Sequence, residues 1–352
     1  MMQVEMPVSS LVTDEELEMI REMAVRYLAV NFTPEDATYE RVARFQERVA
    51  AYDLEVANGG AMNLYKSQSI ILGKPDRDEV IDKYNEFTRV LGRLGIRGGY
   101  IAWQPNGIFR TKVAVGEHTH GAPSMFCDMA EISARPISND RVYGEQEIWD
   151  NFAYFLKRAL PVCEEADVKI ALHPNDPPVE SLGGVHSLIY RSEDYRRAFE
   201  LSGNSPYLGM KMCTGCWLET GDAFGDLLAD IDEFVRAGKV LTVHFRNVSS
   251  QVPVFEETLA EDGYADMFAI ARQLVRSGYE GMMNVDHVFR APDGGEHTFA
   301  GGTLAGGSIW SAAYATGYMK GLIDGAYKAE AAAGSGVPVD VAASDIGEGA
   351  NA

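Results

Sequence analysis

Hydrophobic and polar positions follow two distinct rhythms along this chain. Short runs rich in apolar and β-branched residues predict buried strands. They occur at residues 2–7, 26–31, 53–58, 98–103, 168–173, 207–213, 239–246 and 281–287. Longer stretches with apolar residues three or four positions apart predict helices. These begin at residue 14 and then cover 34–51, 75–94, 144–167, 192–201, 221–236, 257–277 and 309–327, the second starting at a Thr33-Pro34 cap signal.

This alternation predicts a single parallel barrel. Buried strands joined by helices form parallel β/α units, and eight such units fit a (β/α)8 TIM barrel, an α/β fold. We expect one catalytic domain over residues 1–330 and a flexible tail over 331–352, where Ala, Gly and Ser dominate. Residues 104–143 form a long irregular excursion after the fourth strand, typical of an active-site lid. An open doubly wound sheet is the alternative, but no G-x-G-x-x-G follows the first strand.

Composition narrows the class of protein. The chain has 31 Lys and Arg against 52 Asp and Glu, a net charge of −21 that repels nucleic acid and anionic lipid. No apolar run reaches the length of a membrane span, and the acidic N-terminal segment does not resemble a signal peptide. Four cysteines in a chain of this length do not form a disulfide framework. We therefore expect a cytoplasmic protein with a small-molecule substrate and no nucleic-acid or membrane partner.

Four predicted strands carry residues that can bind a metal ion at or near their carboxyl ends. These are His173, Cys213, His244 and Asp286. In a closed barrel the carboxyl ends of the strands surround one point, so the four side chains should converge there. Two imidazoles, one thiolate and one carboxylate suit Zn²⁺, Fe²⁺, Co²⁺ or Mn²⁺ better than Mg²⁺. The sequence thus predicts a divalent metal site, although each residue alone would more often be structural.

Cys213-Thr-Gly-Cys216 also offers a rival interpretation. A C-x-x-C pair can be a redox couple or half of a structural zinc site. No second C-x-x-C occurs in the chain, so a four-cysteine zinc site is excluded. A thioredoxin-like motif would open a helix, whereas Cys213 is expected to close a strand. The strand-end metal site is therefore the preferred interpretation.

Residues next to the expected metal site suggest acid–base and binding roles. His287 is the best candidate for proton transfer, because a free imidazole titrates near neutrality. Arg246 and Arg110 are candidates for clamping a substrate carboxylate, and Arg246 is also a candidate catalytic residue. Asn175 and Asp176 could bind substrate hydroxyls or orient a neighbouring ligand. The structural alternatives are a core histidine, salt bridges within the barrel and an Asx-turn.

Several motifs resemble the mannonate dehydratase family of xylose-isomerase-like barrels. They are ILGKPDRDEVIDKYNEFTRVLGRLGI, WQPNGIFRT, ALHPNDPP, MCTG, VHFRNV and VDH, in order from Ile71 to His287. The resemblance implies a divalent metal, typically manganese, held by the same four strand-end residues, with His287 in acid–base catalysis. It further implies dehydration of D-mannonate to 2-keto-3-deoxy-D-gluconate. Family members are often oligomers, so a homo-oligomer is expected.

The chain also departs from the pattern of that family. Asn175 stands where an acid is usual, Cys216 replaces a small serine-like residue, and no tyrosine follows Asp286-His287 in the matching segment. We expect His297 to stand in as the second acid–base group, with His120 and Tyr65 as other candidates for the proton donor. A different reaction on the same barrel stays open: another lyase, an isomerase, an epimerase or a hydrolase. A non-catalytic metal-binding barrel is a third hypothesis.

Overall fold

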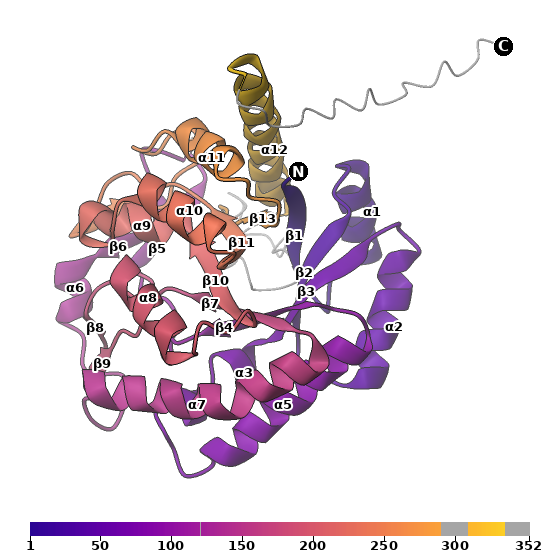
Figure 1. The fold of residues 1–352 in the computed structure, drawn as a ribbon. Coiled ribbons are helices and arrows are strands. Elements are labelled where there is room, and N and C mark those ends of the chain that lie inside the picture. Colours follow the sequence, from indigo (N-terminus) through magenta and orange to yellow (C-terminus); the bar gives the residue numbers. More distant parts are fainter. Residues whose placement is uncertain (120, 290–308, 335–352) are drawn as a thin grey trace.

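The strands close into a parallel eight-stranded barrel (Figure 1). The computed structural model describes residues 1–119, 121–289 and 309–334. The barrel strands are β1 (Gln3–Ser9), β2 (Tyr27–Phe32), β3 (Glu55–Ala61), β4 (Gly98–Ala102), β7 (Lys169–His173), β10 (Leu208–Cys213), β11 (Val240–Phe245) and β13 (Met282–Val285). Neighbours in sequence are neighbours in the ring, and β1 closes it by pairing with β13. The predicted barrel is therefore confirmed.

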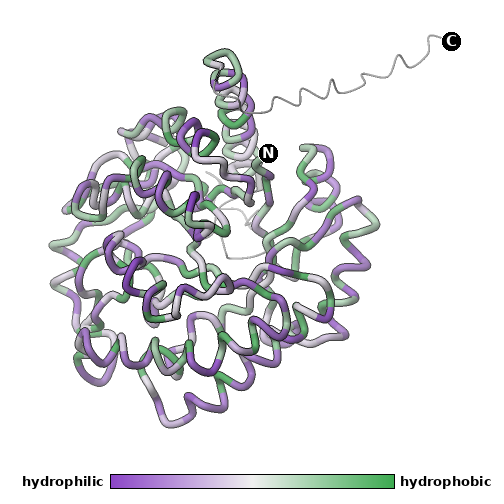
Figure 2. Tube along the Cα trace, viewed as in Figure 1, coloured by the Kyte–Doolittle hydropathy of each residue, from purple (hydrophilic) through white to green (hydrophobic). Residues whose placement is uncertain are grey.

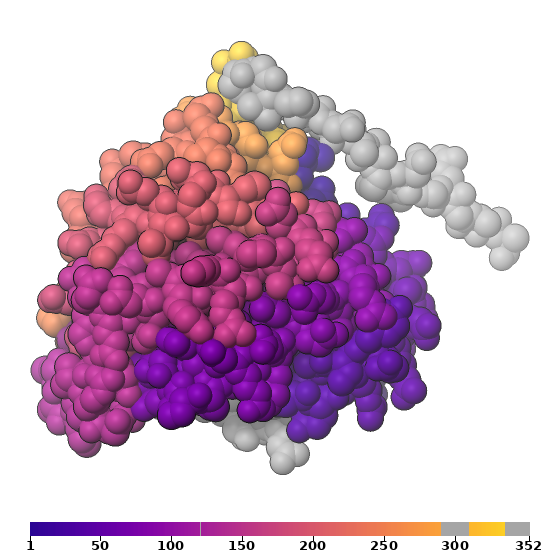
Figure 3. All heavy atoms as spheres, turned by 60° about the horizontal axis from the view of Figure 1, so that its bottom comes forward, coloured from indigo at the N-terminus to yellow at the C-terminus, as the bar shows by residue number. Residues whose placement is uncertain are grey.

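A layer of helices surrounds the barrel (Figure 1). It consists of α1 (Asp14–Glu22), α2 (Tyr39–Ala50), α5 (Arg77–Arg93), α7 (Glu145–Ala166), α8 (Ser192–Leu201), α10 (Leu227–Arg236), α11 (Met267–Arg276) and α12 (Ile309–Ala332). Hydrophobic and hydrophilic residues alternate along these helices (Figure 2). In α2, for example, Val42, Phe45 and Val49 are buried, as expected for an amphipathic helix that packs on a sheet. Seen as spheres, the N-terminal and middle segments pack directly against one another (Figure 3).

Three predicted helix starts were wrong. The Thr33-Pro34 signal forms a turn, in which the Asp36 N–H donates to the Thr33 carbonyl oxygen at 3.0 Å, and α2 starts after a Thr38 cap. The helix expected over 257–277 starts only after Asp266, and the one expected over 221–236 starts after Asp226. In each case a side-chain oxygen caps free N–H groups of the first turn. A short helix that the sequence did not predict, α9 (Thr214–Thr220), follows β10 directly.

The excursion after β4 is more ordered than the sequence suggested. It contains β5 (Lys112–Val115), β6 (Pro123–Asp128) and α6 (Met129–Ser133). β6 pairs antiparallel with β5 and with β12 (Val254–Glu256), which comes from the segment after β11. This three-stranded sheet ties residues 104–143 to a distant loop. The short helices α3 (Met62–Tyr65) and α4 (Gln68–Ile71) and the hairpin of β8 (Ser181–Leu182) and β9 (Val185–His186) complete the loops.

The last predicted helix is longer than expected at its C-terminal end. Helix α12 runs to Ala332, just past the expected start of the tail at 331. Residues 335–352, and residues 290–308 with the candidate His297, lie outside the described part of the chain. Among the helices that are described, none is both long and apolar enough to cross a membrane.

Candidate metal centre

The four predicted ligands converge at the carboxyl ends of their strands. His173 and Cys213 are the last residues of β7 and β10, His244 lies in β11, and Asp286 directly follows β13. Their candidate donor atoms all lie within 4.8 Å of one another. The Nδ1 atom of His244 is 3.1 Å from Oδ2 of Asp286. The barrel thus places all four side chains where one cation could touch them, while their role as ligands stays a prediction.

The protonation of these side chains suits a divalent cation. Burial alone would raise the pKa of Cys213, but hydrogen bonds from Cys216 and the histidines and the charge of Arg246 lower it well below its usual range. Burial lowers the pKa of His173. Its Nδ1 lies 2.7 Å from the Pro174 carbonyl oxygen, which can only accept, so Nε2 is left for a metal. A thiolate, neutral imidazole and carboxylate are the forms that bind divalent metals.

The geometry removes one argument against the C-x-x-C interpretation. Cys213 ends β10 as expected, and it also sits at the N-cap of α9, a helix that the sequence did not predict. Cys216 lies in the first turn of α9 and accepts from Arg246 across 3.6 Å. Burial and the nearby Cys213 raise the pKa of Cys216 well above its usual range. One thiolate beside one neutral thiol fits a metal ligand with a hydrogen-bonding neighbour.

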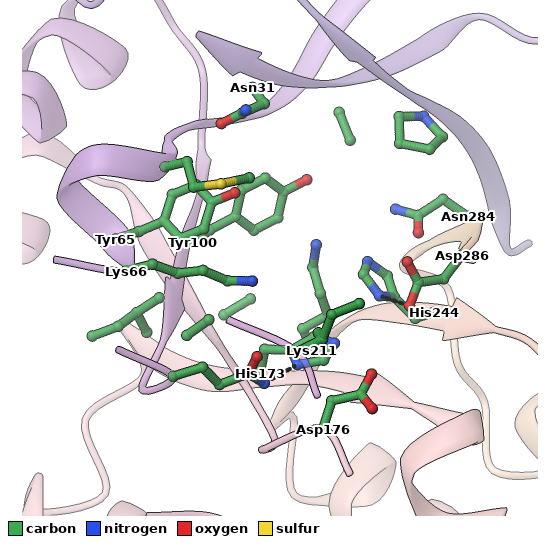
Figure 4. Close-up of a pocket in the computed structure, with 18 of the residues that line it drawn as sticks. Asn31, Tyr65, Lys66, Tyr100, His173, Asp176, Lys211, His244, Asn284 and Asp286 are labelled. Atoms are coloured by element: carbon green, nitrogen blue, oxygen red, sulfur yellow. Dashed lines mark hydrogen bonds and ion pairs between the residues drawn. The ribbon is translucent and has the colours of Figure 1, made fainter. Parts of the chain in front are cut away.

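A cavity of about 300 Å³ opens beside the four candidate ligands. Its wall includes Asn31, Tyr65, Lys66, Tyr100, Lys211 and Asn284 together with His173, Asp176, His244 and Asp286 (Figure 4). His287 also lines it. Among these polar groups, Asn31 Oδ1, the Tyr100 hydroxyl and Asn284 Oδ1 are buried and have no hydrogen-bond partner. Buried polar atoms without a partner are costly unless a ligand or water satisfies them. The cavity therefore has the character of a site for a polar small molecule.

His287 is held in an unusual position at the edge of this cavity. Its backbone φ is 49°, a left-handed value that is strained for a residue with a side chain. Its Nδ1 lies 2.8 Å from Oε1 of Glu257, and its Nε2 lies 3.7 Å from both Asp176 and Asp286. Burial alone would lower the pKa of His287, but Asp286 and Glu257 outweigh it and raise the pKa to about 9. A cation bound to Asp286 would offset part of that negative charge.

Arg110, Arg246, Asp176, Glu219 and Glu257 form what we call the arginine–carboxylate cluster. The Arg110 guanidinium lies 2.6 Å from Asp176 and 2.9 Å from Glu219, and it also donates to Glu257. Arg246 lies 3.1 Å from Asp176, 2.8 Å from Glu219 and 3.0 Å from Glu257. All five side chains are at least 94% buried. Protein carboxylates therefore occupy both guanidinium groups, and the predicted substrate clamp by these arginines gains no support.

Of the other two predicted binding residues, Asp176 lines the cavity and Asn175 does not. Asp176 lines the cavity and belongs to the arginine–carboxylate cluster, where burial would raise its pKa but Arg110 and Arg246 lower it to about 2. Asn175 does not line the cavity. It accepts from the Ile189 N–H at 3.0 Å and donates to the Trp103 carbonyl oxygen at 3.3 Å, so it holds two loops together.

Four residues of the site escaped the sequence interpretation. Lys211 lies two residues before Cys213 in a strand, and the period of two places both on the same side, so this signal was available. Lys66 follows the short helix α3, which the sequence did not predict. Glu219 lies in the unpredicted α9, and Glu257 was assigned to a helix that starts later. Burial lowers the pKa of both lysines, that of Lys211 to about 8.

Comparisons with known proteins agree with this fold. The family model for D-mannonate dehydratase matches residues 139–332. Mannonate dehydratase from Streptococcus pneumoniae is 27% identical over 308 residues, covering 78% of this chain and 81% of that protein. The crystal structure of mannonate dehydratase from Streptococcus suis serotype 2 superposes with a TM-score of 0.81 at 24% identity and covers 94% of this chain and 96% of that one. A xylose isomerase domain protein from Planctomyces limnophilus has a TM-score of 0.60 at 12% identity, covering 93% and 98%.

Proposed function

Because the chain belongs to the D-mannonate dehydratase family, we propose that it is a hydro-lyase that removes water from D-mannonate and forms 2-keto-3-deoxy-D-gluconate. The observation that carries this proposal is the convergence of His173, Cys213, His244 and Asp286 beside a polar cavity. His287, which can transfer protons, lines the same cavity. The proposal is thus a carbon–oxygen lyase reaction on a sugar acid.

We propose Mn²⁺ as the metal, with Fe²⁺, Co²⁺ and Zn²⁺ as alternatives. The two histidines, Cys213 and Asp286 would hold it. A bound divalent ion would polarise the substrate's carboxylate and 2-hydroxyl and so make the proton on C2 more acidic. Asp286 suits this role because its pKa lies well below its usual range: burial would raise it, but His287 and His244 lower it.

His287 is proposed to move a proton at Nε2. Glu257 holds its Nδ1 at 2.8 Å and thereby fixes the ring, so Nε2 is the nitrogen that faces Asp286 and Asp176. Glu257 is itself fixed by both arginines of the cluster. The arginine–carboxylate cluster is therefore proposed to position His287 and not to bind substrate.

Elimination of water also needs a group that protonates the departing 3-hydroxyl. Of the three candidates from the sequence, His120 and His297 lie outside the described residues, and Tyr65 lines the cavity. Burial raises the pKa of Tyr65 above its ordinary value. Tyr65 therefore stays protonated and can donate, so it is the candidate that we carry forward.

Product analysis tests the proposal directly. The protein is stripped of metal, reloaded with Mn²⁺ and incubated with D-mannonate, and the keto-deoxy acid is measured by its reaction with semicarbazide and by mass spectrometry. We expect one water lost per turnover, and no product after chelation. Formation of an isomeric sugar acid without loss of water would favour an epimerase or isomerase instead. No change in any substrate with metal bound would leave a binding protein.

Location and assembly stay predictions. Cys127, Cys163, Cys213 and Cys216 are all free, which supports a reducing cytoplasm. A homo-oligomer is expected from the family, and size-exclusion chromatography with light scattering would measure it.

A further inference from the structure

Two lysine side chains project into the cavity next to the metal ligands (Figure 4). Lys211 comes from the inner face of β10 and is 8% exposed. Lys66 follows α3 on the facing wall. Neither ammonium group makes an ion pair or hydrogen bond with any of the described residues. By contrast, the buried Lys239 donates to the carbonyl oxygens of Asn204, Ser205 and Leu208.

The surroundings of the two lysines orient their ammonium groups without forming a direct ion pair with them. The Lys211 ammonium lies 3.6 Å from the centre of the Tyr100 ring, an interaction that orients a cation but leaves its charge in place. Four anionic groups act on the lysines through their charge. Asp286 and Cys213 belong to the candidate metal-binding set, Asp176 pairs with Arg110 and Arg246, and Glu5 accepts hydrogen bonds from Asn58, Thr242 and Asn284. A divalent cation bound by Asp286 and Cys213 would balance their two negative charges. Lys66 and Lys211 then face the cavity with no carboxylate of the described residues in direct contact, which is unfavourable unless an anion binds.

The remaining polar groups of the cavity complete a binding surface. Asn31 Oδ1, the Tyr100 hydroxyl and Asn284 Oδ1 have no partner and are uncharged. Asn284 is held in place because its Nδ2 donates to Glu5 at 2.7 Å. Such neutral groups suit hydroxyls, whereas ammonium groups suit a carboxylate. Groups that bind an anion and groups that bind hydroxyls thus lie in one cavity, as a polyhydroxylated acid requires.

We propose that Lys66 and Lys211 form the subsite that binds the substrate carboxylate and so select sugar acids over neutral sugars. This inference rests on the proposed function and deepens it. Arg110 and Arg246 are not available for this task, because Asp176, Glu219 and Glu257 engage both guanidinium groups. The two lysines also lie where they would stabilise negative charge that develops on the carboxyl oxygens during proton removal.

The test compares a charged ligand with its neutral counterpart. Lys66→Met and Lys211→Met are made in a His287→Gln background, so that Mn²⁺-loaded protein binds without turnover. Titration calorimetry then measures Kd for D-mannonate and for D-mannonamide, which lacks the charge. We expect each substitution to weaken mannonate binding by about 10- to 100-fold, the usual range for a lost charged hydrogen bond. Binding of mannonamide should change by no more than about threefold.

Lys239→Met is the matched control. It also removes a buried lysine, but from the opposite end of the barrel, before the first residue of β11. This variant should keep the full preference for mannonate over mannonamide. Metal content and circular dichroism confirm that each variant is loaded and folded. In the active background, Lys211→Met should raise KM for D-mannonate.

The inference fails if the lysine variants weaken the acid and the amide equally, or weaken neither. Its failure can be distinguished from failure of the proposed function. If no keto-deoxy acid forms, the same titrations are repeated with D-gluconate and D-gluconamide. Loss of the preference for the acid in the lysine variants would still support the subsite. If the unmodified cavity shows no preference for either acid over its amide, the inference is overturned, whatever the product assay shows.

Discussion

Two pairs of cationic side chains flank the same candidate metal ligands, and they differ in what surrounds them. In the arginine–carboxylate cluster, three carboxylates engage the guanidinium groups of Arg110 and Arg246. On the cavity side, Lys66 and Lys211 have no ion-pair or hydrogen-bond partner among the described residues. The difference teaches that a cation near a site is not thereby a substrate contact. A saturated cation supports the fold and its neighbours, and an unsatisfied one is free for a ligand.

The largest expected effect comes from removing what the two regions share. Asp286→Ala should abolish stable metal binding and lower kcat/KM for D-mannonate by roughly 10³-fold or more, because a bound cation supplies several kcal/mol of charge stabilisation. Metal content after dialysis and the initial rate of keto-deoxy acid formation measure both. Cys163→Ala, a buried free cysteine in α7, is the control and should keep metal and activity. An active, metal-loaded Asp286→Ala variant would contradict the assignment.

The next largest effect tests whether the arginine–carboxylate cluster positions His287. His287→Gln should lower kcat by about 10²- to 10⁴-fold, the range for loss of an acid–base group, while metal content stays unchanged. Glu257→Gln should show a weaker version of the same defect, since Glu257 only positions the ring. A His287→Gln variant with kcat close to that of the wild type would show that the cluster serves stability alone.

Stability separates the two pairs most sharply. Arg246→Met leaves the three buried carboxylates of the cluster with one arginine instead of two, and it should lower the free energy of unfolding by about 3–5 kcal/mol. Lys211→Met removes an unpaired buried charge, so it should leave that free energy unchanged or raise it by about 1 kcal/mol while binding the substrate less well. Urea denaturation of the metal-free variants measures both values. Equal destabilisation by the two substitutions would contradict the claim that the arginines support the fold and the lysines do not.

The smallest effect concerns an ion pair on the outer helices. Burial would raise the pKa of Glu330, but hydrogen bonds from Arg272 and Arg276 lower it. A lowered carboxyl pKa contributes stability above the unfolded value of about 4.3, and this contribution is lost as the pH falls through the folded value. Glu330→Gln should therefore cost no more than about 1 kcal/mol at pH 7. The difference in unfolding free energy between the wild type and the Glu330→Gln variant should shrink when denaturation is measured below about pH 4.

The sequence revealed the parts of this molecule that depend on local patterns. The barrel and its strand ends could be predicted because apolar runs are short and are followed by Pro, Gly or charged residues. The positions of His173, Cys213, His244 and Asp286 at or beside strand ends could be predicted for this reason. Glu257 was missed because its neighbours also fit a helical pattern, and only pairing between β12 and β6 makes the segment extended. Partners of Arg110 and Arg246 could not be predicted, because such contacts join loops that are distant in sequence.

The small antiparallel sheet has a consequence for protein engineering. The N–H of Glu257 donates to the Met125 carbonyl oxygen at 2.9 Å, and the Glu257 side chain grips the ring of His287. The excursion over residues 104–143, which precedes β7, is thus linked through Glu257 to the side chain of His287 after β13. A chimera that imports residues 104–143 from a relative must therefore import residues 254–258 with them. Otherwise Glu257 would lose its place in the sheet, and His287 would lose the contact that orients its ring.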